Sequence, residues 1–375
     1  METRSRPVSP TRQTVYLKWF LCLFTCALLF AIFGVRANPI DNEVFNLYAG
    51  VRVGPHKLYD PQAFRAIAAA LGPVMTARLY YCRMPYFVVL TAPLGWFPYP
   101  VAVAFWRSVQ TLAIAAAILL WRRSRRTMAM VALASLPAVW VVSTGQDVAL
   151  VFLAVAGSVA LLRRDKPVLA GAVFSLCLGK PHLVVFVPLA LLALKNYRFL
   201  LGAAAGGASQ ILFSFAMAGP DWPRQWLANL SDAQMHPNVQ AMPGLRAIAQ
   251  TGPGIVLAAL IAGSLAVAVW KLAGRRPIEE AMAYALAAGV LGNLHSYGVD
   301  CILLIPAVTV ALTSPRISER GVGIFLATPV PYISMIFGFP ALLQAGILAL
   351  VHLPFAPQAA TLGEQPLASL EGPGS

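Results

Sequence analysis

The feature that most constrains this chain is a series of long apolar runs, most of them separated by short basic connections. The first extends from about residue 15 to residue 35, and the others follow between residues 86 and 353. A helix needs about 20 consecutive apolar residues to cross a membrane. A membrane β-barrel would instead show short segments of alternating polarity. The runs therefore predict an all-α polytopic membrane protein with a bundle of about 11–13 transmembrane helices.

The composition of the chain supports the same class. Of the 375 residues, 59% are hydrophobic and 11% are charged, whereas a soluble domain has about half and about a quarter. Disorder is excluded, because disordered chains combine low hydrophobicity with high charge. The formal net charge of +14 would suggest nucleic-acid binding in a soluble protein. No aromatic-basic motif supports that partner here, and no nucleic acid is predicted.

Basic residues cluster in connections between apolar runs, which is the distribution of cytoplasmic loops under the positive-inside rule. The clusters are residues 122–126, 163–166, 195–198, 275–276 and 316–320. A basic stretch also precedes the first run, which predicts an uncleaved first helix that starts in the cytoplasm. The polar connections that then share the extracytoplasmic face are residues 143–147, 179–182, 219–253 and 295–300. For the short segment Tyr86–Phe97, the sequence leaves open whether it spans the membrane or is re-entrant.

The predicted organisation is one integral membrane domain with short extensions. Its parts are a cytoplasmic basic N-terminus (residues 1–14), the membrane domain (residues 15–354) and a disordered tail (residues 355–375). The domain includes two large extracytoplasmic loops, at residues 38–83 and 219–253. The Ala- and Arg-rich composition is typical of a bacterial protein, and the expected location is the plasma (inner) membrane. Gly202 and Gly206 have the small-xxx-small spacing of close helix packing.

Two carboxylates, Asp41 and Glu43, directly follow the first apolar run at its predicted outer end. A carboxylate at the membrane boundary can reach a lipid-linked substrate and act as a general base. The competing interpretation is an acidic residue of a solvated loop, and the spacing alone does not decide between the two.

Two further polar segments interrupt apolar runs on the same face. Gln146 and Asp147 are costly between two apolar helices unless they face a cavity or a partner, although Asp147 could instead cap the next helix. Lys180 is a candidate point-charge ligand for phosphate. The alternative is a lysine that snorkels from a helix end to the membrane surface.

A third polar segment, between two late apolar runs, contains His295, Tyr297 and Asp300. These side chains could bind phosphate or metal, or orient a base. Helix capping and interfacial anchoring of Tyr297 are the alternatives. A metal site is weakly indicated, because no second pair has ligand spacing. The five cysteines form no CxxC pattern, and neither a metal nor another cofactor is predicted.

The loop at residues 219–253 is rich in Trp, Pro, Asn and Gln. Trp222, Trp226, Asn238 and Gln240 suit the faces and hydroxyls of a sugar acceptor, and the aromatic residues equally suit an interfacial belt. The sequence contains no P-loop, no GxGxxG before a strand, no HExxH and no GxSxG. A glycosyl donor would therefore be lipid-linked rather than a nucleotide sugar.

The order of these motifs resembles glycosyltransferase family 87, over roughly residues 41–307. The motifs concerned are Asp41 with Tyr48-Ala49 and Leu58-Tyr59-Asp60, Met84-Pro85-Tyr86 with Ala92-Pro93-Leu94 and Phe97-Pro98, Gly145-Gln146, Arg163-Arg164 with Ala170-Gly171 and Gly179-Lys180-Pro181, Asn238-Val239-Gln240 with Gly244-Leu245, and His295, Tyr297 and Asp300. Two positions depart from the family pattern. Arg83 precedes Met84-Pro85 where an aromatic-Pro-Pro sequence is usual, and Asp147 replaces an apolar or amide residue.

The resemblance implies a C-type glycosyltransferase fold that uses polyprenyl-phosphate mannose as donor. The implied reaction transfers mannose to an extracytoplasmic glycolipid or lipoglycan of the cell envelope, with inversion at the anomeric carbon. Asp41 would be the general base. Lys180 and His295 would stabilise the phosphate, and the residues implied for the sugar pocket are Gln146, Tyr297 and Asp300. The implied partners are the donor, the glycan acceptor and membrane lipids.

Two other functions remain open at this stage. A transporter or flippase of lipid-linked sugars would need polar groups through the whole depth of the membrane, whereas here they gather at one face. The other is an assembly subunit with a degenerate site. The acceptor, the choice between mannose and another sugar, and the oligomeric state are not determined by the sequence.

Overall fold

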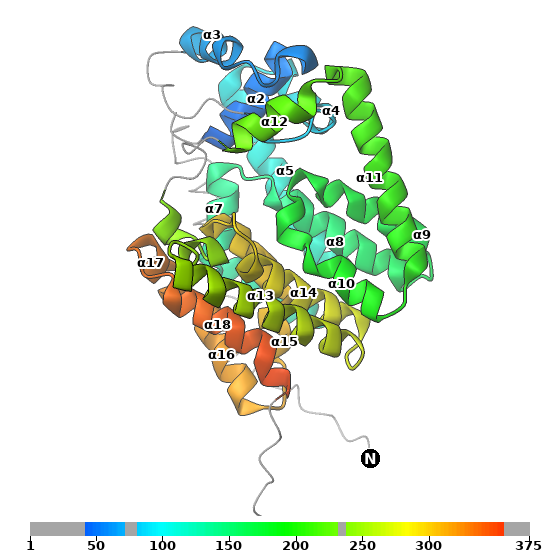
Figure 1. Cartoon of the computed structure of the whole chain (residues 1–375), viewed down its shortest axis with the longest axis vertical. Coiled ribbons are helices and arrows are strands. Elements are labelled where there is room, and N and C mark those ends of the chain that lie inside the picture. Colours follow the sequence, from blue (N-terminus) through cyan, green and yellow to red (C-terminus); the bar gives the residue numbers. More distant parts are fainter. Residues whose placement is uncertain (1–41, 72–80, 232–237, 356–375) are drawn as a thin grey trace, which may run out of the picture.

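The computed structural model describes residues 42–71, 81–231 and 238–355, and every regular element in these ranges is a helix. The predicted all-α class is confirmed. Figure 1 shows a short layer of helices at one end of the molecule, above a larger helix bundle. This layer consists of α2 (Asn42–Val53), η2 (Pro55–Lys57), α3 (Pro61–Leu71), α4 (Phe87–Thr91), η3 (Ala92–Trp96) and α12 (Trp222–Ser231).

Three described helices are each long and apolar enough to cross a membrane. They are α5 (Tyr99–Leu120), α11 (Tyr197–Ala218) and α13 (Gly252–Ala273), of 22 residues each, or about 33 Å. A fourth span is formed if α6 (Arg125–Ala134) and α7 (Leu136–Thr144), bent by 66°, cross together. The chain is therefore a polytopic membrane protein, and the total of about 11–13 spans stays a prediction.

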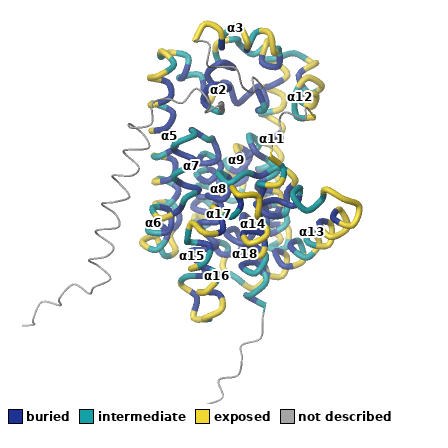
Figure 2. Tube along the Cα trace, turned by 90° about the vertical axis from the view of Figure 1, so that its left-hand side faces the viewer, coloured by how far each residue is buried: buried dark blue, intermediate teal, exposed yellow. Residues whose placement is uncertain are grey.

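The other helices of the bundle are shorter, and several stop at breaks within the apolar core. They are α8 (Val148–Leu162), α9 (Pro167–Phe174), η4 (Ser175–Gly179), η5 (Pro181–Val184), α10 (Phe186–Ala193), η7 (Val239–Ala241), η8 (Leu245–Ala247), α14 (Ile278–Gly292), η9 (Gly298–Leu304), α15 (Ile305–Leu312), α16 (Ile317–Ala327), α17 (Val330–Ile336), α18 (Ala341–His352) and η10 (Leu353–Phe355). Figure 2 shows buried residues concentrated along α8 and α14, which form the centre of the bundle.

Close helix packing confirms the interpretation of the small-residue spacing in α11. A Cβ added at Gly202 would lie 2.0 Å from the carbonyl oxygen of Val168 in α9, and one at Gly171 would lie 2.0 Å from that of Phe199. A Cβ at Gly206 would meet the hydroxyl of Ser175 at 2.4 Å. Only glycine permits this approach of the α9 and α11 backbones.

The open question about the segment Tyr86–Phe97 is answered by its length. α4 and η3 together cover Phe87–Trp96, and ten residues cannot cross a hydrocarbon core about 30 Å thick. Tyr86 donates its backbone N–H to the hydroxyl of Ser214 in α11 at 3.1 Å, which ties the segment to one end of that helix. The segment is therefore re-entrant or interfacial.

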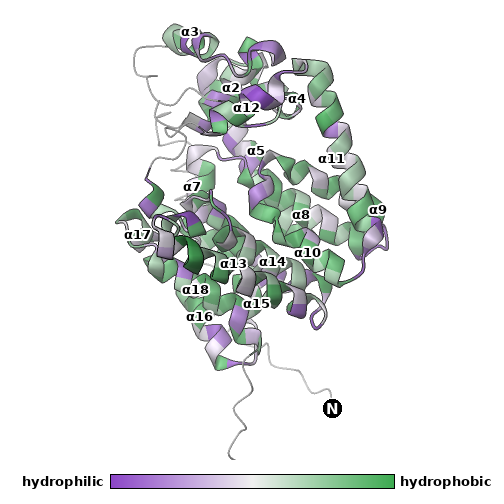
Figure 3. Ribbon diagram, viewed as in Figure 1, coloured by the Kyte–Doolittle hydropathy of each residue, from purple (hydrophilic) through white to green (hydrophobic). Residues whose placement is uncertain are grey.

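Three of the basic connections meet at the end of the bundle opposite α2 and α12. Arg123 pairs with Glu280 at 2.6 Å, Arg163 pairs with Glu279, and Arg276 pairs with Glu280 at 3.3 Å. Both glutamates begin α14 and are buried. Figure 3 shows hydrophobic residues along the helices and hydrophilic ones mainly towards the two ends of the bundle.

Candidate active site

At the end of the bundle near α2 and α12, the polar residues lie at breaks between helices. Gly145 ends α7 in the left-handed conformation with φ of 66°, and its carbonyl accepts a hydrogen bond from the indole of Trp106 at 2.8 Å. Lys180 lies between η4 and η5 with φ of −141°. Pro181 follows it, and a residue before proline is disfavoured in the helical conformation. Each break thereby directs a polar side chain into the space between helices.

Arg83 connects the break at Asp147 to Glu43 in α2 through its guanidinium group. Its Nε and Nη2 atoms donate to the two carboxylate oxygens of Asp147 at 2.5 and 2.9 Å. Its Nη2 also donates to Oε1 of Glu43 in α2, at 2.6 Å. The planar guanidinium group suits such bidentate binding of a carboxylate, which a lysine could not reproduce.

Lys180 extends the network to Asp300 in η9. Its Nζ lies 3.0 Å from Oδ1 of Asp300 and 3.4 Å from Oδ1 of Asp147, and it donates to Oε1 of Gln146 at 3.3 Å. The other oxygen of Asp300 accepts the backbone N–H of Tyr297 at 2.8 Å. Lys180 is therefore a buried, paired lysine, and the snorkelling alternative is wrong.

We name this set the polar network: Glu43, Arg83, Gln146, Asp147, Lys180 and Asp300. It contains three carboxylates and two cations, and Asp147 and Asp300 are 2% and 1% exposed. Burial by itself would raise the pKa of Asp147, but the adjacent Arg83 and Lys180 outweigh it and lower that pKa to about 2. Asp147 precedes α8 without a side-chain capping bond, so the capping alternative is wrong.

The convergence expected from the sequence is confirmed by contacts between the four polar connections. Asp147, Lys180 and Asp300 join three of them directly. The fourth joins through Leu245, whose N–H donates to the carbonyl of Asn293 at 2.9 Å. Which membrane face this end occupies stays a prediction.

A second group of side chains, the imidazole cluster, lies next to the polar network. The rings of His182 and His295 are 5.5 Å apart, and those of His295 and Tyr297 are 5.1 Å apart, both edge to face. These three side chains are only partly buried, unlike Lys180 and Asp300. They are thus the groups of the site that a ligand can reach most directly. In the described ranges, no three His, Cys, Asp or Glu side chains are arranged to hold a metal ion.

The acceptor-loop candidates have different environments. Trp222 is 4% exposed and packs against Phe215 and Trp226, with ring centroids 5.5 and 6.1 Å away. The indole of Trp226 donates to the carbonyl of Cys82 at 3.1 Å, next to Arg83. Both tryptophans hold α12 in place within the layer of helices above the bundle. Asn238 and Gln240, by contrast, are exposed.

Asp41, the predicted general base, lies outside the described residues. The sequence places it two positions before Glu43, the first residue of the polar network. Sequence reasoning assigned no site role to Glu43's partner Arg83 or to His182. Each had a weak signal: Arg83 breaks the family pattern, and His182 follows Lys180-Pro181 in the same polar turn.

The sequence comparison agrees with this arrangement. The model of glycosyltransferase family 87 matches residues 84–296, which is more than half of the chain. The chain belongs to glycosyltransferase family 87. No curated protein and no solved structure matches the chain.

As a member of family 87, the protein is a membrane glycosyltransferase, which favours the enzyme over the transporter alternative. The matched region includes Gln146, Asp147, Lys180 and His295, and it is narrower than the expected span of residues 41–307. The remaining members of the polar network lie outside it. Their contacts with one another and with Asp147 and Lys180 join them to the matched region.

Proposed function

We propose that the protein transfers mannose from a polyprenyl-phosphate donor to an extracytoplasmic glycolipid or lipoglycan, with inversion at the anomeric carbon, in a bacterial plasma membrane. The observation that carries this proposal is the polar network buried at one end of an apolar bundle, beside the accessible imidazole cluster. Intramembrane charged residues are costly, and they are retained where they line a substrate site.

An apolar surface beside the network suits a lipid-linked donor. The ring of Phe87 in α4 lies within 3.0 Å of where a Cβ of Gly179 would be, so α4 packs against the break that carries Lys180. Val89 and Leu90, two and three residues further along α4, are 48% and 44% exposed. A prenyl chain would cover this surface while its phosphate reached the site.

Burial divides the donor-site residues into two groups. Lys180 and Asp300 are nearly inaccessible and neutralise each other, so we assign them to positioning. Gln146, His295 and Tyr297 are partly exposed, and we assign them to direct contact with the donor. An imidazole and a phenol next to a departing phosphate can stabilise its developing charge by hydrogen bonding.

In the proposed reaction, the carboxylate of Asp41 takes the proton of an acceptor hydroxyl as its oxygen attacks the anomeric carbon. The bond between that carbon and the phosphate oxygen breaks, and polyprenyl phosphate leaves with the bonding electron pair. No metal or other cofactor takes part in the proposed step. Asn238 and Gln240, both exposed on the loop after α12, are the proposed acceptor contacts.

The test is transfer of labelled mannose in nanodiscs that contain polyprenyl-phosphate mannose and a mannosylated glycolipid. The variants are Asp41→Asn and, as matched control, Asp165→Asn, which changes an exposed residue in a basic turn. We expect transfer by the wild type and the control and a loss of about 10²–10⁴-fold in Asp41→Asn. Full activity of Asp41→Asn would move the base elsewhere. Transfer from polyprenyl-phosphate glucose but not mannose would contradict the proposed sugar.

A further inference from the structure

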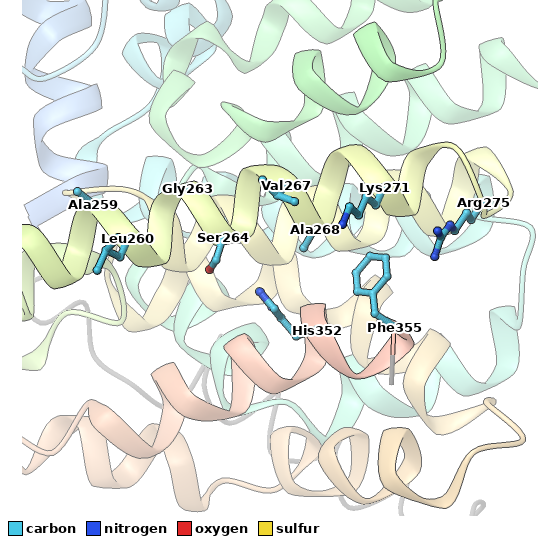
Figure 4. A pocket seen from close by; sticks show the side chains of 10 residues that line it. All are labelled: Ala259, Leu260, Gly263, Ser264, Val267, Ala268, Lys271, Arg275, His352 and Phe355. Carbon is cyan, nitrogen blue, oxygen red and sulfur yellow. The ribbon is translucent and has the colours of Figure 1, made fainter. Parts of the chain in front are cut away.

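A groove of about 790 Å³ lies far from the polar network, between α13 and the C-terminal end of α18 (Figure 4). Its apolar wall is the exposed face of α13, where Leu260 is 66% and Val267 is 54% exposed. Gly263 lies between them, and a Cβ added there would meet no atom within 4 Å. The groove therefore offers an open apolar channel along a helix of membrane-spanning length.

One end of the groove is basic. Lys271 lies in the last turn of α13 and Arg275 lies two residues beyond the end of the helix, and both line the groove. Figure 4 shows that their side chains and that of His352 point into the space between α13 and α18. Nδ1 of His352 is 3.2 Å from the carbonyl oxygen of Leu348. When Nδ1 donates to that carbonyl, Nε2 is left for a ligand.

The basic end has no compensating acid among the described residues. Arg276, the next residue, pairs with Glu280 at 3.3 Å, but neither Lys271 nor Arg275 has a carboxylate partner within the described ranges. Arg275 instead lies over the ring of Phe355, 6.0 Å from its centroid. Within the part of the chain that the structure describes, the groove thus combines positive charge that no carboxylate neutralises with an apolar wall.

The position of the groove along α13 indicates at which membrane boundary its basic end lies. α13 begins after η8, which is bonded to Asn293 at the end that holds the polar network. It ends 22 residues later, about 33 Å away, beside the buried glutamates that pair with Arg123 and Arg163. The basic end therefore lies at the membrane boundary opposite the candidate active site, and the apolar wall extends inward from it.

We propose that the groove binds one anionic phospholipid of the leaflet opposite the active site. Its phosphate lies between Lys271, Arg275 and His352, and one acyl chain runs along Leu260, Gly263 and Val267. Basic pockets between transmembrane helices recognise anionic headgroups in this way, and charge-assisted hydrogen bonds favour phosphate oxygens. A free phosphate would leave the apolar wall unused. This proposal is independent of the proposed glycosyl transfer.

The first test measures lipid binding by native mass spectrometry of the purified protein. The probes are phosphatidylglycerol and phosphatidylcholine with identical acyl chains. We expect tighter binding of phosphatidylglycerol, and about thirtyfold weaker binding in Lys271→Gln/Arg275→Gln, since each basic residue contributes about a fivefold preference. The matched control, Arg126→Gln/Arg198→Gln, removes two exposed basic residues near the starts of α6 and α11 and should bind like the wild type.

A second pair of variants tests the apolar wall. Gly263→Leu places a side chain in the groove, and Gly321→Leu introduces the same change in α16, where a Cβ also meets no atom within 4 Å. We expect Gly263→Leu to lose phosphatidylglycerol and Gly321→Leu to retain it. Because neither glycine is in contact with a neighbour at its Cβ position, both variants should fold.

Four results would overturn the proposal. Equal binding of the two lipids would remove the headgroup preference, and equal losses in both double variants would indicate a general surface-charge effect. Displacement of the lipid by excess inorganic phosphate would indicate an anion site without an acyl chain. A protein dimer that Gly263→Leu abolishes, with no lipid bound to the wild type, would make the groove an interface between copies.

Discussion

Replacement of Arg83 by methionine tests whether the polar network depends on this one guanidinium group. In the wild type, Arg83 neutralises Asp147 and Glu43, while Lys180 neutralises Asp300 and assists Asp147. Arg83→Met would leave three carboxylates around a single lysine. Breaking a buried pair by removal of one partner costs about 3–5 kcal/mol, because the other charge stays buried. We expect a loss of this size in the free energy of unfolding.

Replacement of Asp147, the partner of Arg83, should lower the free energy of unfolding by less. In Asp147→Asn, Arg83 retains Glu43 and Lys180 retains Asp300, so each cation keeps one carboxylate. We expect a loss of about 1–3 kcal/mol, the cost of weakened hydrogen bonds to charged groups. The double variant should lose about 2 kcal/mol less than the sum of the single losses, since residues in one network are coupled.

The measurement is unfolding by SDS titration in mixed micelles, followed by tryptophan fluorescence. The matched control is Arg65→Met, because Arg65 is exposed and its Nε donates to the backbone carbonyl of Pro61, at 3.2 Å, rather than to a carboxylate. The control should change the free energy of unfolding by less than about 0.5 kcal/mol. The reasoning is refuted if Arg83→Met costs no more than the control. Additivity of Arg83→Met and Asp147→Asn within about 0.5 kcal/mol would also refute it.

Three further predictions concern the purified protein and single substitutions in it. The pKa of Asp147 is lowered from 3.8 to about 2 in the folded protein, so its ionised form stabilises the fold above about pH 5 and this contribution is lost as pH falls towards 2. The difference in unfolding free energy between wild type and Asp147→Asn should therefore be constant from about pH 5 to pH 8 and shrink below about pH 4. A steady change in this difference between pH 5 and pH 8 would contradict the assigned pKa. Gly289→Ala should lower the free energy of unfolding by about 1–3 kcal/mol, because the added Cβ would lie 2.0 Å from the carbonyl oxygen of Leu183. The control Gly321→Ala should be neutral or stabilising, because a Cβ there meets no atom within 4 Å. Equal effects of the two changes would argue against the close approach at Gly289. His295→Gln should lower kcat for transfer from the lipid donor, because the side chain is assigned to the charge that develops on the departing phosphate, and it should not change the free energy of unfolding. A loss of unfolding free energy with an unchanged kcat would indicate a purely structural role.

Much of the candidate site could be located from the sequence because its residues interrupt apolar runs. Gln146, Lys180 and Asp300 each lie in a short polar turn, and the charge of neighbouring connections predicts that these turns share one face. Their mutual contacts confirm the convergence. A polar turn in the sequence does not reveal how deeply its side chains are buried. The degree of burial separates the inaccessible Lys180 and Asp300 from the accessible imidazole cluster.

The pairing of Arg83 with Asp147 shows the limit of that reasoning. The two residues are 64 positions apart, and in the sequence each is a separate departure from the family pattern. In the fold they bond to each other through both carboxylate oxygens. Thus the two departures are compensating, because without Arg83 the buried carboxylate of Asp147 would lose its bidentate partner, which is strongly destabilising.

The length of each apolar run is local information, and the sequence by itself was sufficient to predict the helical membrane class and the close packing at Gly202. It also distinguished basic connections from the polar turns at the other end. Tertiary structure decided that α4 is too short to span and that Trp222 is buried. It also decided that one groove beside α13 has basic side chains with no carboxylate partner among the described residues. These outcomes depend on which helices pack together. A hydropathy pattern specifies that an apolar face must be covered, but not which neighbour or ion pair covers it.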